Sequence, residues 1–102
     1  MPTLRIEHAV PDFTRWKQAF DSDPVDRKGS GVRRYQVLRS VEDPNFVLID
    51  LEFDSTEEAE GLLAKMRQVW SSGEGQRVMR NPQARIVERV EAIELKPASS
   101  PA

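Results

Sequence analysis

The sequence predicts an α+β domain in which two helices cover one face of a four-stranded antiparallel sheet. Apolar and polar residues alternate in four stretches, and apolar residues recur at helical spacing in two others, in the order strand, helix, strand, strand, helix, strand. Right-handed crossovers place both helices on the same face. The length of 102 residues predicts a single domain over residues 1–95, followed by a disordered tail at 96–102.

The first strand and the first helix lie within the first 21 residues. Residues 3–10 alternate apolar and charged side chains, which predicts a half-buried strand. Asp12 begins a helix, because its carboxylate can accept hydrogen bonds from the free N–H groups of the first turn. The helix is expected to end at Asp21. Residues 22–31 are rich in Asp, Pro, Lys, Gly and Ser, which predicts a mobile loop and the best candidate for a lid over a pocket.

Residues 32–41 and 45–53 predict an antiparallel hairpin joined by a tight turn at residues 42–45. One side of its second strand is an unbroken apolar row, which we expect to face the helices: Val47, Ile49, Leu51 and Phe53. The other side is mixed and consists of Phe46, Leu48, Asp50 and Glu52. Apolar residues on a free sheet face usually mark an interface, so a two-fold homodimer packed face to face is expected.

A capping box begins the second helix, with Ser55 as the cap and Glu58 three residues later. Its apolar residues follow helical spacing as far as Trp70. The helix is expected to end within residues 71–75, with a short turn over 76–80. Alternation over residues 83–95 then predicts the last strand. This order of elements is the ferredoxin-like pattern.

The composition excludes several classes of function. The chain has 15 Lys and Arg against 17 Asp and Glu, a formal charge of −2, which argues against a nucleic-acid partner. It has no cysteine and one histidine, so no disulfide, thiolate nucleophile or site of two histidines can form, and we expect neither a metal nor a cofactor. No apolar run is long enough to span a membrane, and no signal peptide is evident, so a cytoplasmic location is expected.

Several short runs resemble the dimeric α+β-barrel superfamily, and more narrowly its small bacterial members near the antibiotic-biosynthesis-monooxygenase-like group. The resemblance covers roughly residues 4–93. The runs that carry it are residues 8–21, Leu38-Arg39, Asp43-Pro44-Asn45, residues 51–54 and Glu57-Glu58-Ala59. It implies a homodimer whose two sheets form a barrel, with a pocket in each subunit between the sheet and the helices. The superfamily contains cofactor-free monooxygenases, haem-degrading enzymes, isomerases and cyclase-like proteins, so the fold alone does not assign a reaction.

The sequence departs from the monooxygenase pattern of that superfamily. Those enzymes use an asparagine on the first strand with a tryptophan and a histidine or arginine near the second helix. Here the first strand has no asparagine, and the only histidine lies on that strand, whereas Trp70 matches by position. The departure weighs against both the oxygenase and the haem-degrading activities.

Two residues are candidates for catalysis, His8 and Asp50. The imidazole of His8 has an ordinary pKa near neutrality, so it is a candidate proton shuttle; alternatively it is a half-buried residue that ends an apolar row or bonds to the first helix. Desolvation inside a dimer would raise the pKa of Asp50 towards that of a general base. The alternative for Asp50 is a salt bridge to an arginine on a neighbouring strand: Arg5, Arg34 or Arg85.

Four further residues are candidates for binding a substrate: Tyr35, Phe46, Leu48 and Trp70. Each has a structural alternative, such as core packing for Trp70 or a place at the sheet edge for Tyr35. Two functions remain open. The first is a dimeric protein that binds a small apolar or aromatic metabolite. The second is a cofactor-independent monooxygenase, isomerase or cyclase that acts on an aromatic or polyketide-like substrate.

Overall fold

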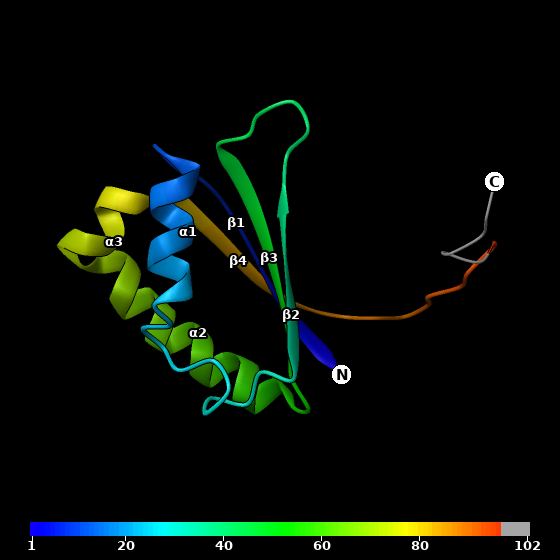
Figure 1. Cartoon of the computed structure of the whole chain (residues 1–102). Helices are drawn as coiled ribbons and strands as arrows, with labels where there is room; N and C mark the ends of the chain where they lie inside the picture. Colours follow the sequence, from blue (N-terminus) through cyan, green and yellow to red (C-terminus); the bar gives the residue numbers. More distant parts are fainter. Residues whose placement is uncertain (97–102) are drawn as a thin grey trace.

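Four strands form one antiparallel sheet, and three helices cover one of its faces (Figure 1). The computed structural model describes residues 1–96. The ferredoxin-like fold class is confirmed, with the strand order β2-β3-β1-β4. In chain order the elements are β1 (Pro2–Ala9), α1 (Phe13–Asp21), β2 (Arg34–Arg39), β3 (Phe46–Glu52), α2 (Thr56–Ser71), α3 (Gly73–Val78) and β4 (Arg80–Glu88).

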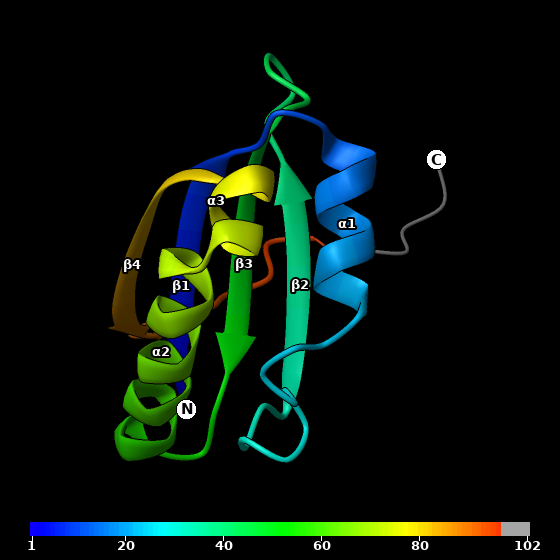
Figure 2. The same ribbon diagram turned by 90° about the vertical axis from the view of Figure 1, so that its left-hand side faces the viewer.

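The core lies between the sheet and the helices. Leu4 of β1 pairs with Leu51 of β3, and Ile6 pairs with Ile49, so the apolar rows of the two central strands lie side by side on the face that the helices cover. The predicted row of β3 is buried, and Phe53 just beyond its end is 0% exposed. In Figure 2, α2 lies over β1 and β4, whereas α1 lies beside β2.

Both predicted helix caps form. The Asp12 carboxylate accepts a hydrogen bond from the N–H of Arg15 at 3.3 Å. Ser55 Oγ accepts one from the N–H of Glu58 at 3.2 Å, and the Glu58 carboxylate lies 3.3 Å from the same hydroxyl. These contacts satisfy N–H groups that a helix leaves unpaired in its first turn.

The second helix, α2, ends at Ser71, within the predicted range 71–75. Only Ser72 separates it from α3, which begins at Gly73 and is a helix where a short turn over residues 76–80 is predicted. Ser72 ends one helix and caps the next, since its hydroxyl accepts a hydrogen bond from the N–H of Gly75 at 3.1 Å. None of the helices within residues 1–96 is long and apolar enough to cross a membrane.

The predicted limits of the last strand, 83–95, are wrong at both ends, because β4 runs from Arg80 to Glu88. Glu88 pairs with Pro2, where β1 begins, so β1 offers no further backbone partners beyond that point. Val90 beyond the strand is 91% exposed. Apolar and polar residues continue to alternate in the sequence beyond Glu88, but β1 has no residues left there to pair with them. Of the predicted tail, residues 97–102 lie outside the described part of the chain.

Candidate functional site

An apolar cavity of about 270 Å³ lies between α1, the α2–α3 pair and the sheet. Ile6 and Ile49 contribute the sheet side of it. Among the described residues, its only charged lining residues are Arg27 and Glu74. The rest of the lining is largely apolar and includes aromatic rings and thioethers from Trp16, Phe20, Met66, Trp70 and Met79. Such a lining favours a flat apolar ligand, because rings and thioethers pack closely on aromatic faces.

The helices position the aromatic wall. Trp16 is 3% exposed, and its ring centroid lies 5.2 Å from that of Phe20 and 5.9 Å from that of Phe13 along the same side of α1. The close approach of α3 to α2 depends on Gly75, because a Cβ atom there would lie 2.1 Å from the carbonyl oxygen of Val69. A glycine at this position therefore brings α3 against the end of α2 that carries Trp70.

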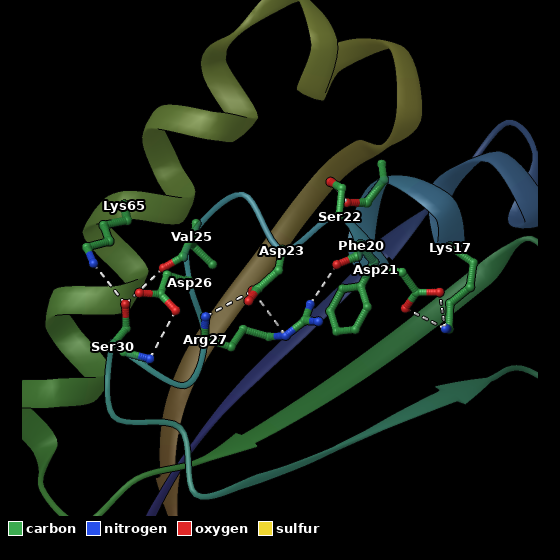
Figure 3. A network of polar contacts seen from close by, with 12 residues as sticks. Lys17, Phe20, Asp21, Ser22, Asp23, Val25, Asp26, Arg27, Ser30 and Lys65 are labelled. Carbon is green, nitrogen blue, oxygen red and sulfur yellow. Dashed lines mark hydrogen bonds and ion pairs between the residues drawn. The ribbon is translucent and has the colours of Figure 1, made fainter.

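The segment Ser22–Gly31, which we call the strap, lies beside the cavity and contributes Ser22, Pro24, Val25 and Arg27 to its lining. The prediction of a loop here is confirmed, but hydrogen bonds hold it in a defined conformation (Figure 3). The Arg27 backbone N–H donates to the Asp23 carboxylate at 2.9 Å. Asp23 and Asp26 adopt left-handed backbone conformations, with φ values of 55° and 51°, which Asp tolerates better than most residues.

His8 is buried on the helix-covered face and is 3% exposed, not half-buried. Its ring meets that of Trp16 edge-on at 5.6 Å, so it contacts α1 through packing, and its Nδ1 lies 3.2 Å from the carbonyl oxygen of Ala9. A carbonyl only accepts, so Nδ1 carries the proton in this contact. Burial lowers the pKa of His8 below its ordinary value, which favours the neutral ring. His8 does not line the cavity.

Asp50 lies on the opposite face of the sheet, which we call the open face, and forms the predicted salt bridge with Arg5. Arg5 Nε donates to Oδ1 at 2.8 Å and Nη2 donates to Oδ2 at 2.9 Å, while Gln36 Nε2 donates to Oδ2 at 3.0 Å. The hydrogen bond from Arg5 lowers the pKa of Asp50 despite its burial. This direction is opposite to the rise expected for a general base.

The four predicted substrate-binding residues divide between the two faces of the sheet. Trp70 lines the cavity. Tyr35 pairs with Leu51 and so shares the helix-covered face, where its ring meets Phe20 edge-on at 5.5 Å, but it lies outside the cavity. The alternation of β3 places Phe46 and Leu48 on the open face with Asp50. The structure therefore places His8 and Asp50 on opposite faces of the sheet. It does not bring the four binding candidates together at one site either.

Sequence reasoning missed most of the cavity wall. The helical spacing of Trp16 and Phe20 predicts core packing, with an aromatic pocket as the alternative for Trp16; both residues pack against the core and also line the cavity. Arg27 and Val25 were overlooked within the loop. The available signal was Val25 itself. It is the only aliphatic side chain among residues 22–31, and valine is one of the residue types most often buried.

Solved structures of other proteins share this fold. SnoaB of Streptomyces nogalater, a cofactor-independent oxygenase, matches with a TM-score of 0.73 at 11% identity, over 90% of this chain and 95% of its own. An antibiotic biosynthesis monooxygenase matches with a TM-score of 0.60 at 7% identity, over 89% of this chain and 100% of its own. The chain shares the ferredoxin-like α+β fold of these proteins. No protein-family model and no curated protein sequence matches it.

A third similar structure allows a test of haem-type ligation. MhuD, solved with two manganese protoporphyrin IX molecules per active site, matches with a TM-score of 0.69 at 13% identity, over 92% of this chain and 99% of its own. The cavity here is lined by no imidazole, thiolate or phenol within the described residues, and His8 lies outside it. Nor do three potential metal-binding side chains gather anywhere in residues 1–96. Within the described residues, this cavity therefore offers such a group no histidine, cysteine or tyrosine ligand; its two thioethers, from Met66 and Met79, are the side chains of a kind that can bind haem iron.

Proposed function

We propose that the chain binds a small apolar or aromatic metabolite in the cavity between the sheet and the helices. The observation that carries this proposal is the lining itself: three aromatic side chains and two thioethers border about 270 Å³, and within residues 1–96 the charged lining residues are Arg27 and Glu74 alone. Ligand pockets typically hold roughly 300–1,000 Å³. The volume here lies just below that range, so it suits a ligand of one or two rings.

Tryptophan fluorescence can test this directly, because the chain has two tryptophans, Trp16 and Trp70, and both line the cavity. 1-Naphthol is a neutral two-ring probe whose binding can be followed through the change in tryptophan fluorescence. We expect a saturable change for the wild-type chain. Ala19 also lines the cavity, so Ala19→Leu fills part of it and is expected to weaken binding at least tenfold.

The control for this experiment is Val41→Ala, which shortens an apolar side chain that is fully exposed and absent from the cavity. This variant is expected to bind the probe as the wild type does. If Ala19→Leu binds the probe with unchanged affinity, the probe occupies another site and the proposed function loses its support.

We also propose that the protein acts as a homodimer joined through the open faces. Leu38 and Leu48, which are paired in the β2–β3 register, form an apolar patch there with Phe46. Beside this patch, the Asp50 carboxylate already has its hydrogen bonds from Arg5 and Gln36. A second copy can cover such a face without leaving this carboxylate unpaired.

The dimer is tested by light scattering after size-exclusion chromatography. We expect the wild type to show twice the mass of one chain and Leu38→Glu to show the mass of one chain. Dimerisation would desolvate the carboxylate introduced on the patch, which is energetically costly. Val41→Glu is the control, since Val41 is fully exposed in the turn after β2. A dimer that survives Leu38→Glu would place the interface elsewhere.

A second candidate function is a cofactor-independent oxygenase, isomerase or cyclase acting on an aromatic or polyketide-like substrate. The similarity to SnoaB favours it, and the proton carriers proposed for it are His8 and Asp50. Neither lines the cavity, so the binding function has the stronger support. Oxygen uptake or conversion of a bound phenolic ligand that is lost in His8→Ala or Asp50→Asn would favour the enzyme instead.

A further inference from the structure

Val25 occupies an unusual place for a loop residue. It is 7% exposed and packs with the core, although its neighbours in the strap are polar. It lines the cavity, and it also lines a shallow groove on the outside between the strap and α2. The two hollows share four residues: Pro24, Val25, Val69 and Glu74. Val25 therefore stands at the boundary between the cavity and the outer surface.

No direct polar contact joins the two sides of this boundary. Within residues 1–96, no hydrogen bond or ion pair joins residues 24–26 of the strap to residues 68–74 of α2 and α3. The hydrogen bond from Lys65 of α2 to Ser30 is the polar contact that must yield if Val25 moves away from Val69. A boundary held by so few polar contacts is a favourable place for a ligand to enter.

Two polar anchors hold Val25 in place from either side (Figure 3). On one side, Arg27 Nη1 donates to the carbonyl oxygen of Phe20 at 2.7 Å, and the guanidinium carbon lies 3.9 Å from the centroid of the Phe20 ring and 4.8 Å from that of Tyr35. On the other side, Lys65 Nζ donates to Ser30 Oγ at 2.8 Å, and this hydroxyl donates to the carbonyl oxygen of Val25 at 2.9 Å.

We propose that Val25 is the gate residue that limits the number of fused rings the cavity admits, and that Arg27 is the positioning residue that holds this gate. The inference rests on the proposed binding function. A guanidinium that contacts two aromatic rings and donates a hydrogen bond to a carbonyl fixes the strap more firmly than an exposed lysine can. With the valine in place the cavity takes two fused rings and excludes three.

The test compares two neutral alcohols that differ by one fused ring, 1-naphthol and 9-anthracenemethanol, titrated against tryptophan fluorescence. The wild type is expected to bind the two-ring probe at least tenfold more tightly. Val25→Ala removes two methyl groups and is expected to strengthen binding of the three-ring probe about tenfold, with less than a threefold change for the two-ring probe. Changes of this size are typical when a pocket gains or loses one or two carbon atoms.

Two further variants separate the gate from general damage to the fold. Val25→Thr keeps the shape of the side chain and is expected to keep the wild-type preference for two rings. Arg27→Lys keeps the charge but loses the stacking, so probe dissociation in stopped flow is expected to accelerate about fivefold. Lys28→Gln is the matched control, because Lys28 is exposed on the same loop and absent from the cavity.

The outcomes distinguish this inference from the function on which it rests. If the wild type binds both probes equally, or if Val25→Ala changes their affinities by the same factor, the gate is overturned while binding stands. If Arg27→Lys and Lys28→Gln give equal dissociation rates, the role of Arg27 is overturned. If the wild type binds neither probe, the proposed function fails, and the gate fails with it.

Discussion

Gly75→Ala is expected to lower the free energy of unfolding by about 1–3 kcal/mol, the usual cost of forcing extra atoms into a packed interior. The added Cβ would lie 2.1 Å from the carbonyl oxygen of Val69, and backbone cannot rotate away as a side chain can. Because α3 must then move off α2, the wall that carries Met79 and Val78 shifts. Urea unfolding measures the stability, and the fluorescence titration is expected to show that probe binding is lost.

Gly73→Ala is the matched control, two residues earlier in the same helix. A Cβ there meets no atom within 4 Å. Alanine also restricts the unfolded chain more than glycine does, so this variant is expected to be unchanged or more stable by up to about 1 kcal/mol, with binding retained. Equal losses in the two variants would show that helix propensity rather than close packing sets the effect.

Asp50→Ala is expected to lower the free energy of unfolding by about 2 kcal/mol at pH 7, because it removes hydrogen bonds to a buried charged group. Asp50 is 6% exposed and accepts bonds from both Arg5 and Gln36. Asp54→Ala is the control: its partner is also an arginine, Arg33, but both side chains are exposed, so little change in stability is expected.

The contribution of Asp50 has a defined dependence on pH. Its pKa is lowered in the folded protein, so the native state prefers the charged carboxylate. The stabilisation is therefore present above about pH 4, the ordinary pKa of aspartate, and is lost as the pH falls below it. The free energies of unfolding of the wild type and Asp50→Asn should converge as the pH falls below about 4. A constant difference across that range would contradict the ion pair as its source.

The order of elements could be predicted from the sequence because local signals agreed with the fold. Alternation marked β1 and β3, and Ser55 with Glu58 marked the start of α2. The end of β4 could not be predicted from the sequence, because it depends on where β1 begins and not on residues 89–95 themselves. The helix α3 was missed for a related reason: two glycines in six residues indicate a break, and only packing against α2 makes the second of them an advantage.

The candidate site was less accessible from the sequence than the fold. The alternation of each strand placed His8 with Leu4 and Ile6, and Asp50 on the mixed side of β3, which already separated the two by the thickness of the sheet. What alternation cannot give is the path of an irregular segment. The cavity depends on the strap, in which the buried Val25 stands among residues of types that are usually exposed to solvent.

The strand order also has a consequence for how the chain folds. β1 is central, but its two partners are distant in the chain: Arg5 pairs with Asp50 on one side and with Arg85 on the other. The β2–β3 hairpin closes a short loop, whereas the β1–β4 pairing closes a long one and carries the larger entropic cost. During synthesis β1 therefore has its full set of strand partners only after residue 88 has left the ribosome, so its edge towards β4 stays unpaired longest.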